Sequence, residues 1–148
     1  MLLVMQQISQ YRLQIEQSAQ RKYQSYKLAD ELRQSSDDLT RMVRTYTVTA
    51  NPAYKNYFQR ILDIRNGVVP RPKGYSRIFW DTIIPGDGKL EQSQSNDAIS
   101  LQQLMRNMGF TSAELAKLQE ALAKSDQLVN LENRAMAAME GLYPDDYG

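Results

Sequence analysis

Apolar and small residues recur every three or four positions from Val4 to Tyr46, in a stretch that contains neither proline nor glycine. This spacing places them on one side of a helix, close to the seam of a coiled coil. One helix from Leu2 to Ala50 would be roughly 70 Å long, which exceeds the diameter of a compact domain of this size. Such a rod must bury its stripe against another helix of the chain or against a second copy. The stripe consists of Val4, Ile8, Tyr11, Ile15, Ala19, Tyr23, Tyr26, Ala29, Leu32, Ser36, Leu39, Val43 and Tyr46.

A second helix is predicted over Pro52–Asn66, with Asn51 as its N-cap and Gly67 as its C-terminal stop. Proline is favoured in the first turn of a helix, and the residue before it avoids helical geometry, so the first helix should end here. The second helix is short and rich in aromatic residues. We expect it to fold back on the end of the first helix. Its apolar face comprises Tyr54, Tyr57, Phe58, Ile61, Leu62 and Ile64.

Residues 67–96 lose the helical pattern and are predicted to form an irregular functional loop, with a short helical turn around Ile78–Ile84. A connection this long is more often functional than idle in a compact domain. Helix is expected to resume at Asp97 or Ala98 and to stop at Gly109.

The last helix is predicted to run from Ser112 to about Leu142, because Thr111 and Glu114 have the spacing of a capping box. The chain is therefore predicted to be all-α, a single domain over residues 1–148. Its four helices form an elongated bundle, in which two long helices make the rod and residues 51–110 cap its end. The inward positions of the last helix are predicted to be Leu115, Leu118, Leu122, Leu128, Val129, Ala135, Met136 and Met139.

Charge is divided unevenly along the chain. Residues 1–77 hold 13 Lys and Arg against 6 Asp and Glu, whereas residues 78–148 hold 5 against 11, although the net charge is only +1. We expect the acidic half to pack on the basic half. The basic residues are dispersed and belong to no recognised nucleic-acid module, so no nucleic-acid partner is expected.

The composition also narrows the possible chemistry. Cysteine and histidine are both absent, which removes thiolate chemistry, the commonest general base and the commonest metal ligand. No phosphate loop, nucleophile elbow or dinucleotide fingerprint occurs, and nothing places Asp81 near Glu91 as a carboxylate pair. The segment Asp87–Glu91 lacks the alternating acidic positions of a calcium loop. We therefore expect no enzyme activity, no cofactor and no metal.

Ligand binding fits the residues better. Arginines at positions 44, 65, 71 and 77 lie near tyrosines and Trp80 in the sequence. Guanidinium groups match carboxylates or phosphates, and aromatic rings can bury the rest of a small ligand. The structural alternative is that Arg65 pairs with Asp63 or a helix end and that Trp80 is core. The predicted ligand-binding residues are Arg44, Arg65, Tyr75, Trp80 and Asp81.

Several short sequence blocks occur in an order that resembles a known protein family. They begin at Leu28, Arg44, Ala50, Ile61, Pro70, Ile99, Gly109, Ser125 and Ala135, with Tyr75 and Trp80-Asp81 between them. Together, over about residues 25–143, they resemble the extracytoplasmic sensor segment of bacterial methyl-accepting chemotaxis receptors. Related segments occur in sensor histidine kinases and diguanylate cyclases.

The resemblance implies a periplasmic segment, truncated from an inner-membrane receptor, that works as a homodimer. A small-molecule ligand or a periplasmic binding protein would change helix packing, and the change would travel along the rod. Two alternatives stay open. One is the same sensor on a kinase or cyclase, and the other is a helical protein-interaction module without a small ligand. Met1–Met5 fits either the last turn of a membrane helix or the first turn of the bundle stripe.

Overall fold

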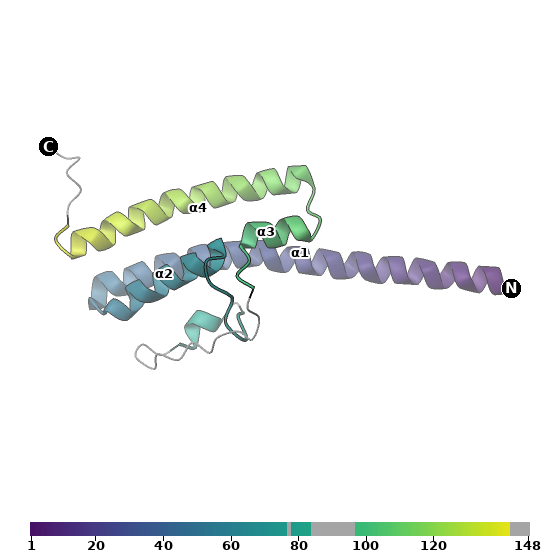
Figure 1. Cartoon of the computed structure of the whole chain (residues 1–148), viewed down its shortest axis with the longest axis horizontal. Coiled ribbons are helices and arrows are strands. Elements are labelled where there is room, and N and C mark those ends of the chain that lie inside the picture. The colour runs from purple at the N-terminus through teal and green to yellow at the C-terminus, as the bar shows by residue number, and fades with distance from the viewer. Residues whose placement is uncertain (77, 84–96, 143–148) are drawn as a thin grey trace.

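The computed structural model describes residues 1–76, 78–83 and 97–142 (Figure 1). Within these residues the fold is all-α, as predicted, with helices and no strand. The elements in chain order are α1 (Leu2–Thr49), α2 (Pro52–Asn66), the 3₁₀ turn η1 (Phe79–Asp81), α3 (Leu101–Asn107) and α4 (Ser112–Met139).

Helix α1 ends where the sequence predicted. Ala50 adopts a left-handed conformation with φ 53°, and its N–H donates to the Tyr46 carbonyl at 2.7 Å. Asn51 then caps α2, because its side chain accepts a hydrogen bond from the Ala53 N–H at 3.0 Å. This tight connection folds α2 back along the C-terminal half of α1, so the two helices form an antiparallel hairpin (Figure 1).

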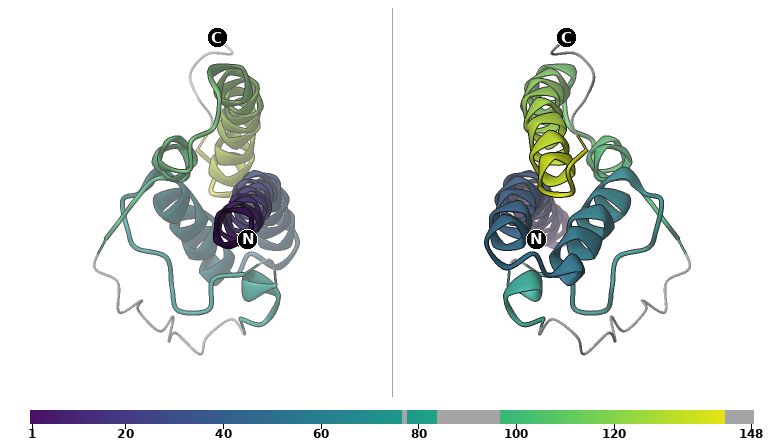
Figure 2. Two further views of the ribbon diagram at one scale, coloured as in Figure 1. Left: turned by 90° about the vertical axis from the view of Figure 1, so that its right-hand side faces the viewer. Right: turned by 90° about the vertical axis from the view of Figure 1, so that its left-hand side faces the viewer.

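The main core lies between α1, α2 and α4. Phe58, Ile61 and Ile64 of α2 are almost completely buried, and Leu39 of α1 is equally inaccessible. Trp80 of η1 belongs to the same core. The η1 turn lies on the opposite side of α1 and α2 from α4 (Figure 2). The predicted helical turn at Ile78–Ile84 is confirmed as η1, although residues 84–96, including Asp87 and Glu91, lie outside the described residues.

Helix α4 runs parallel to α1. Three hydrogen bonds show this, because the residue numbers increase along both segments from one bond to the next: Ser36 with Ser125 at 2.7 Å, Thr40 with Glu132 at 2.7 Å, and Tyr46 with Glu140 at 3.1 Å. The described end of α4 therefore lies at the opposite pole of the molecule from the start of α1 (Figure 1). The sequence pattern predicted the pairing of these helices but not its direction.

The start of α4 is the predicted capping box, in which Thr111 and Glu114 bond each other's side chain and backbone. Its predicted end near Leu142 is wrong, since the helix stops at Met139. Leu115, Leu118, Leu122, Val129 and Met136 face inward as predicted. Leu128, Ala135 and Met139 are exposed, which contradicts the prediction.

Polar residues explain this difference on α4. Ser125 and Glu132 occupy the inward positions between the buried apolar residues, at spacings of three and four. Hydrophobicity alone predicts that apolar neighbours, and not these polar residues, face inward. The interface of α4 with α1 is therefore partly hydrogen-bonded.

Helix α3 begins three or four residues later than predicted, because the Ser100 side chain accepts from the Gln103 N–H at 3.1 Å and caps it there. Leu101 and Met105 of α3 pack with Leu32 of α1 in a second, smaller core. Residues 51–110 were predicted to cap the end of the rod. The described part of them lies instead beside the C-terminal half of α1 (Figure 1).

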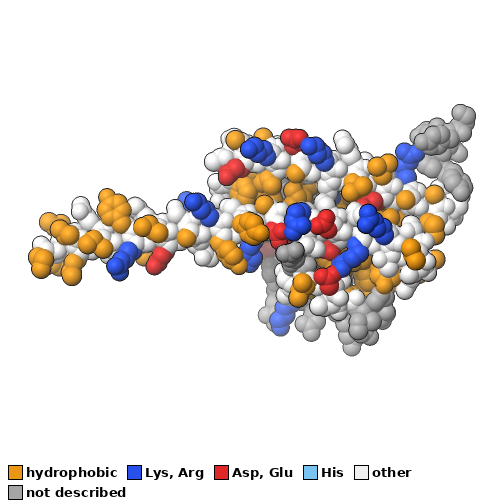
Figure 3. All heavy atoms as spheres, turned by 180° about the vertical axis from the view of Figure 1, so that it is seen from behind, with side chains coloured by type: hydrophobic (Ala, Val, Ile, Leu, Met, Phe, Trp, Pro, Cys, Tyr) orange, Lys and Arg blue, Asp and Glu red, His pale blue; other side chains and the backbone are white. Residues whose placement is uncertain are grey.

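The N-terminal half of α1 has no cover within the described chain. Residues 1–23 are all exposed, and Figure 3 shows hydrophobic side chains along this projecting half. None of the described helices is both long and apolar enough to cross a membrane. The exposed apolar residues here are Leu2, Leu3, Val4, Met5, Ile8, Tyr11, Leu13, Ile15 and Tyr23.

Candidate functional site

The five predicted ligand residues are not brought together. Arg44 is exposed on α1, and Arg65 is buried where α2 faces α4. Only Tyr75 and Trp80 contact each other, through a long hydrogen bond of 3.4 Å from the indole Nε1 to the phenol oxygen. Asp81 is exposed and forms an ion pair with Arg41. Arg77, also considered from the sequence, lies outside the described residues.

Arg65 links α2 to α4. Its side chain is 2% exposed, and its two Nη atoms donate to Ser125 Oγ and Asp126 Oδ1, each at 2.8 Å. Burial lowers the pKa of Arg65, while the charges of Asp126 and Glu132 oppose that shift. The expected pairing of the acidic half with the basic half is seen here, and again between Lys55 and Glu140.

Trp80 is core, as the structural alternative proposed. Its ring is tilted against Tyr57 at a centroid distance of 5.7 Å and lies edge-on to Phe79 at 5.2 Å. Since only 4% of Trp80 is exposed, little of its surface is left for a ligand. Tyr75 lines an open polar cleft, and Arg65 lines a second cleft described further below.

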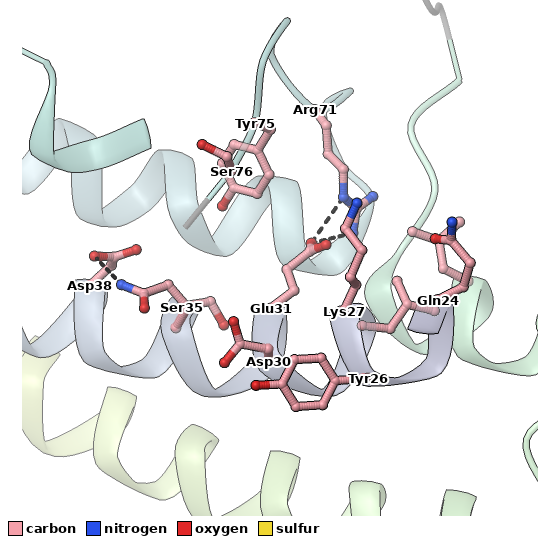
Figure 4. Close-up of a pocket in the computed structure, with 13 residues that line it drawn as sticks. Gln24, Tyr26, Lys27, Asp30, Glu31, Ser35, Asp38, Arg71, Tyr75 and Ser76 are labelled. Carbon is pink, nitrogen blue, oxygen red and sulfur yellow. Dashed lines mark hydrogen bonds and ion pairs between the residues drawn. The ribbon is translucent and has the colours of Figure 1, made fainter. Parts of the chain in front are cut away.

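This polar cleft has a volume of about 360 Å³ and lies between the middle of α1, the segment at 71–76 and α3 (Figure 4). It is open to solvent along one side, and α1 contributes most of its lining. Charged side chains of both signs face it, alongside amide and phenol groups. The charged and phenolic residues that line it are Tyr26, Lys27, Asp30, Glu31, Asp38, Arg71 and Tyr75.

Arg71 holds the walls of the polar cleft together. Its Nε and Nη2 donate to the same oxygen of Glu31, at 2.9 and 2.7 Å, as Figure 4 shows. Its Nη1 donates to the carbonyl of Ile99 at 2.7 Å. One guanidinium therefore connects α1 with the residue that precedes the Ser100 cap of α3. Charge-assisted bonds of this kind are among the stronger polar contacts in proteins.

Close backbone packing supports the same junction. Gly67, with φ 73°, ends α2 and lies against Ile99 and Ser100. A Cβ at position 67 would come within 2.4 Å of the Ser100 nitrogen. Glycine is thus required here by both conformation and space.

Burial changes the pKa of two groups in the polar cleft. Burial raises the pKa of Asp38, although Arg41 and Gln34 each donate to its Oδ1, at 2.9 and 3.2 Å. Burial also raises the pKa of Tyr75 to about 12, so its phenol stays protonated at neutral pH. The cleft therefore offers a neutral phenol beside carboxylates and cations.

Sequence reasoning missed most of this cleft. Lys27, Asp30 and Glu31 lie beside the apolar stripe, where charged residues usually form a solvated helix face. The available signal was Pro70-Arg71-Pro72, since prolines on both sides of an arginine fix an extended segment that presents its side chain.

The cleft has the character of a binding site. Within the described residues no group of three or more acidic side chains is arranged to hold a metal ion. Mixed charges, amides and phenols suit a small polar ligand that carries both an ammonium and an acidic group. No protein-family model, curated protein or solved structure matches the chain.

Proposed function

We propose that this chain is the ligand-sensing segment of a transmembrane signalling protein of the chemotaxis-receptor kind. In this proposal a small zwitterion, such as an amino acid, binds the polar cleft. The observation that carries it is Arg71, which joins a cleft wall on α1 to the segment leading into α3. A ligand carboxylate that takes over the Arg71 guanidinium would release both Glu31 and Ile99.

Helix α1 is the element that would relay this change. The cleft lies on its C-terminal half, and its N-terminal half projects beyond the other helices. A continuous helix moves as a unit by small shifts and rotations, so a change at Glu31 would reach the projecting end. The proposal includes a homodimer, in which a second copy covers the projecting stripe, and a periplasmic location.

The first experiment is a thermal-shift screen of the purified chain against amino acids and small carboxylates. A ligand well above its Kd should raise the melting temperature by several degrees. Arg71→Lys keeps the charge but loses the two-pronged contact, so it should abolish the shift. Arg106→Lys is the matched control and should keep the shift, because Arg106 is at an exposed position of α3 and lines neither the polar cleft nor the second cleft of this molecule.

A second experiment tests the relay. Because the chain has no cysteine, spin labels can be placed on cysteines introduced at the exposed positions Gln20 and Gln103. A ligand identified in the screen should change the distance distribution between α1 and α3. An unchanged distribution at saturation would contradict signalling through this junction.

A helical interaction module without a small ligand is the second candidate, and the uncovered apolar stripe of α1 favours it. It predicts no hit in the screen, and capture of a partner protein that Ile15→Glu abolishes. In the sensor proposal the same substitution should instead weaken the homodimer, measured by sedimentation equilibrium.

A further inference from the structure

A second cleft, of about 200 Å³, lies between the end of α2, α3 and the N-terminal half of α4. We call it the apolar cleft. It is separate from the polar cleft, and no residue lines both. Its apolar lining is Leu32, Leu101, Met105, Leu115, Leu118 and Leu122.

The apolar cleft forms where α3 lies beside α4, on the side of α2 (Figure 2). The C-terminal half of α4 contacts α1 directly, at Thr40 and Tyr46. The N-terminal half of α4 stands farther from α1, with α3 beside it (Figure 1). The leucines that α4 presents here stay only half-buried, so an apolar ligand would cover surface that the chain leaves open to water.

One wall of the apolar cleft is charged. Arg65 contributes to the lining, and its buried Nε has no hydrogen-bond partner among the described residues, although both Nη atoms are paired. A buried donor without a partner costs free energy that an acceptor on a ligand would recover. Because the Nε atom itself is closed to solvent, a ligand acceptor would have to displace the side chains that cover it.

The remaining lining selects the charge of that ligand. Asn66, Ser100, Gln102 and Gln119 are neutral, and no carboxylate lines the apolar cleft. The polar cleft differs, because three carboxylates line it. A ligand in the apolar cleft therefore meets one positive charge and no negative one within the lining, while Asp126, outside the lining, pairs with that charge at 2.8 Å.

From these features we infer that the apolar cleft binds an aliphatic monocarboxylate, with its chain among the leucines and its carboxylate on Arg65. A cavity of about 150 Å³ accommodates benzene, so this cleft fits a ligand of roughly six to eight heavy atoms. Hexanoate has that size. This inference is independent of the proposed function, since it uses neither Arg71 nor the polar cleft.

The test compares three ligands with the same chain length: hexanoate, 1-hexanol and hexylamine. Binding is read from the NMR signal of the Met105 methyl group, which lies in the cleft, during titration of the whole chain. Hexanoate should give a saturable shift, with an affinity higher than that of hexanol by roughly tenfold or more, because a charged hydrogen bond is added. Hexylamine should bind more weakly than both.

Two variants on α4 locate the site. Leu118→Trp fills the cleft and should abolish the hexanoate shift. Leu131→Trp is the matched control, because Leu131 is 60% exposed and lies outside the cleft, and it should leave the shift intact. Arg71→Lys should also bind hexanoate normally, which separates this site from the polar cleft.

Arg65→Gln tests the carboxylate contact and should reduce hexanoate affinity to that of hexanol. If that variant fails to fold, the ligand comparison in the wild-type chain still decides. Equal affinity for hexanoate and hexanol would overturn the inference, and would indicate a cleft that accepts apolar groups such as a partner's side chain. Absence of a saturable shift, or its persistence in Leu118→Trp, would overturn it as well.

Discussion

The two halves of α1 share one apolar stripe but differ in their surroundings. From Ala29 to Tyr46 the stripe is covered by α2, α3 and α4, whereas from Val4 to Tyr26 it faces solvent. The spacing of apolar residues is alike in both halves. The comparison shows that periodicity predicts which face of a helix needs a partner but does not predict where the partner comes from.

The polar residues differ between the halves more than the apolar ones do. The covered half carries acidic and hydroxyl side chains, such as Glu31 and Ser36, that bond to neighbouring elements. The projecting half is rich in glutamine, at positions 6, 7, 10, 14, 17, 20 and 24. Neutral amides impose little charge requirement on a partner, which supports the proposal that an identical copy covers this half.

The strongest test of the comparison is truncation of one stripe residue in each half. Leu39→Ala in the covered half should lower the free energy of unfolding by about 2–5 kcal/mol, since Leu39 is 1% exposed. Ile15→Ala, at 68% exposure, should change it by less than about 0.5 kcal/mol in dilute solution. Urea denaturation measures both, and equal losses would show that the projecting half is covered.

Removing the buried guanidinium of Arg65 should have the next largest effect. Arg65→Gln loses two charge-assisted bonds to α4, which should cost about 1.5–3 kcal/mol in unfolding free energy. The lower end is expected, because Asp126 is 57% exposed and water screens its charge. Arg33→Gln, which breaks only exposed pairs within α1, is the control and should change stability little.

The covered half should also make stability depend on pH. Burial raises the pKa of Asp38 and Glu132, so the folded chain binds more protons than the unfolded chain between each ordinary pKa and its raised value. Stability from these groups is complete below about pH 4 and is lost as pH rises through their raised pKa values. Thermal unfolding should therefore show a melting temperature that increases as pH falls from neutral toward about pH 4, the ordinary pKa range of these carboxyls.

Other carboxyl groups have the opposite effect on stability, and they act at lower pH. The hydrogen bond from the backbone of Thr111 lowers the pKa of Glu114, and that from Lys55 lowers the pKa of Glu140. Their stabilisation is lost as pH falls through those depressed values, so the melting temperature should fall again below about pH 4. Glu132→Gln should flatten the rise in melting temperature on acidification toward about pH 4, whereas Glu120→Gln, on the exposed face of α4, should not. A rise unaffected by Glu132→Gln would contradict the assignment.

The smallest effect is expected at the start of α4. Thr111→Ala removes the capping box and should cost about 1 kcal/mol in unfolding free energy. Hydrogen exchange should locate the loss in the first turns of α4, beside the apolar cleft. Thr47→Ala removes a similar hydroxyl that bonds only within α1, and it should leave α4 exchange unchanged.

Local signals made much of the fold predictable. Asn51-Pro52, Gly67 and the capping box at Thr111 each fix a helix boundary through the chemistry of a few neighbouring residues. The direction of α4 and the inward positions of Ser125 and Glu132 could not be predicted from the sequence. The hydrogen-bond partners of these two residues on α1 are about ninety residues away along the chain.

The candidate site was less predictable for the same reason. Arg71 and Tyr75 belong to a loop that the sequence marked as functional, and Tyr75 was among the predicted ligand residues. Glu31 becomes a site residue only because Arg71 reaches it across forty positions. Neither residue alone indicates that contact.

The projecting half of α1 also governs how the molecule moves through water. A compact chain of this length would have a radius of gyration of about 15 Å, whereas a uniform rod of about 70 Å alone has one of about 20 Å. Friction follows shape as well as mass, so a monomer should leave a gel-filtration column ahead of compact proteins of 17.0 kDa. An early peak is therefore expected of the monomer, and only a measurement of mass, such as light scattering, counts the copies.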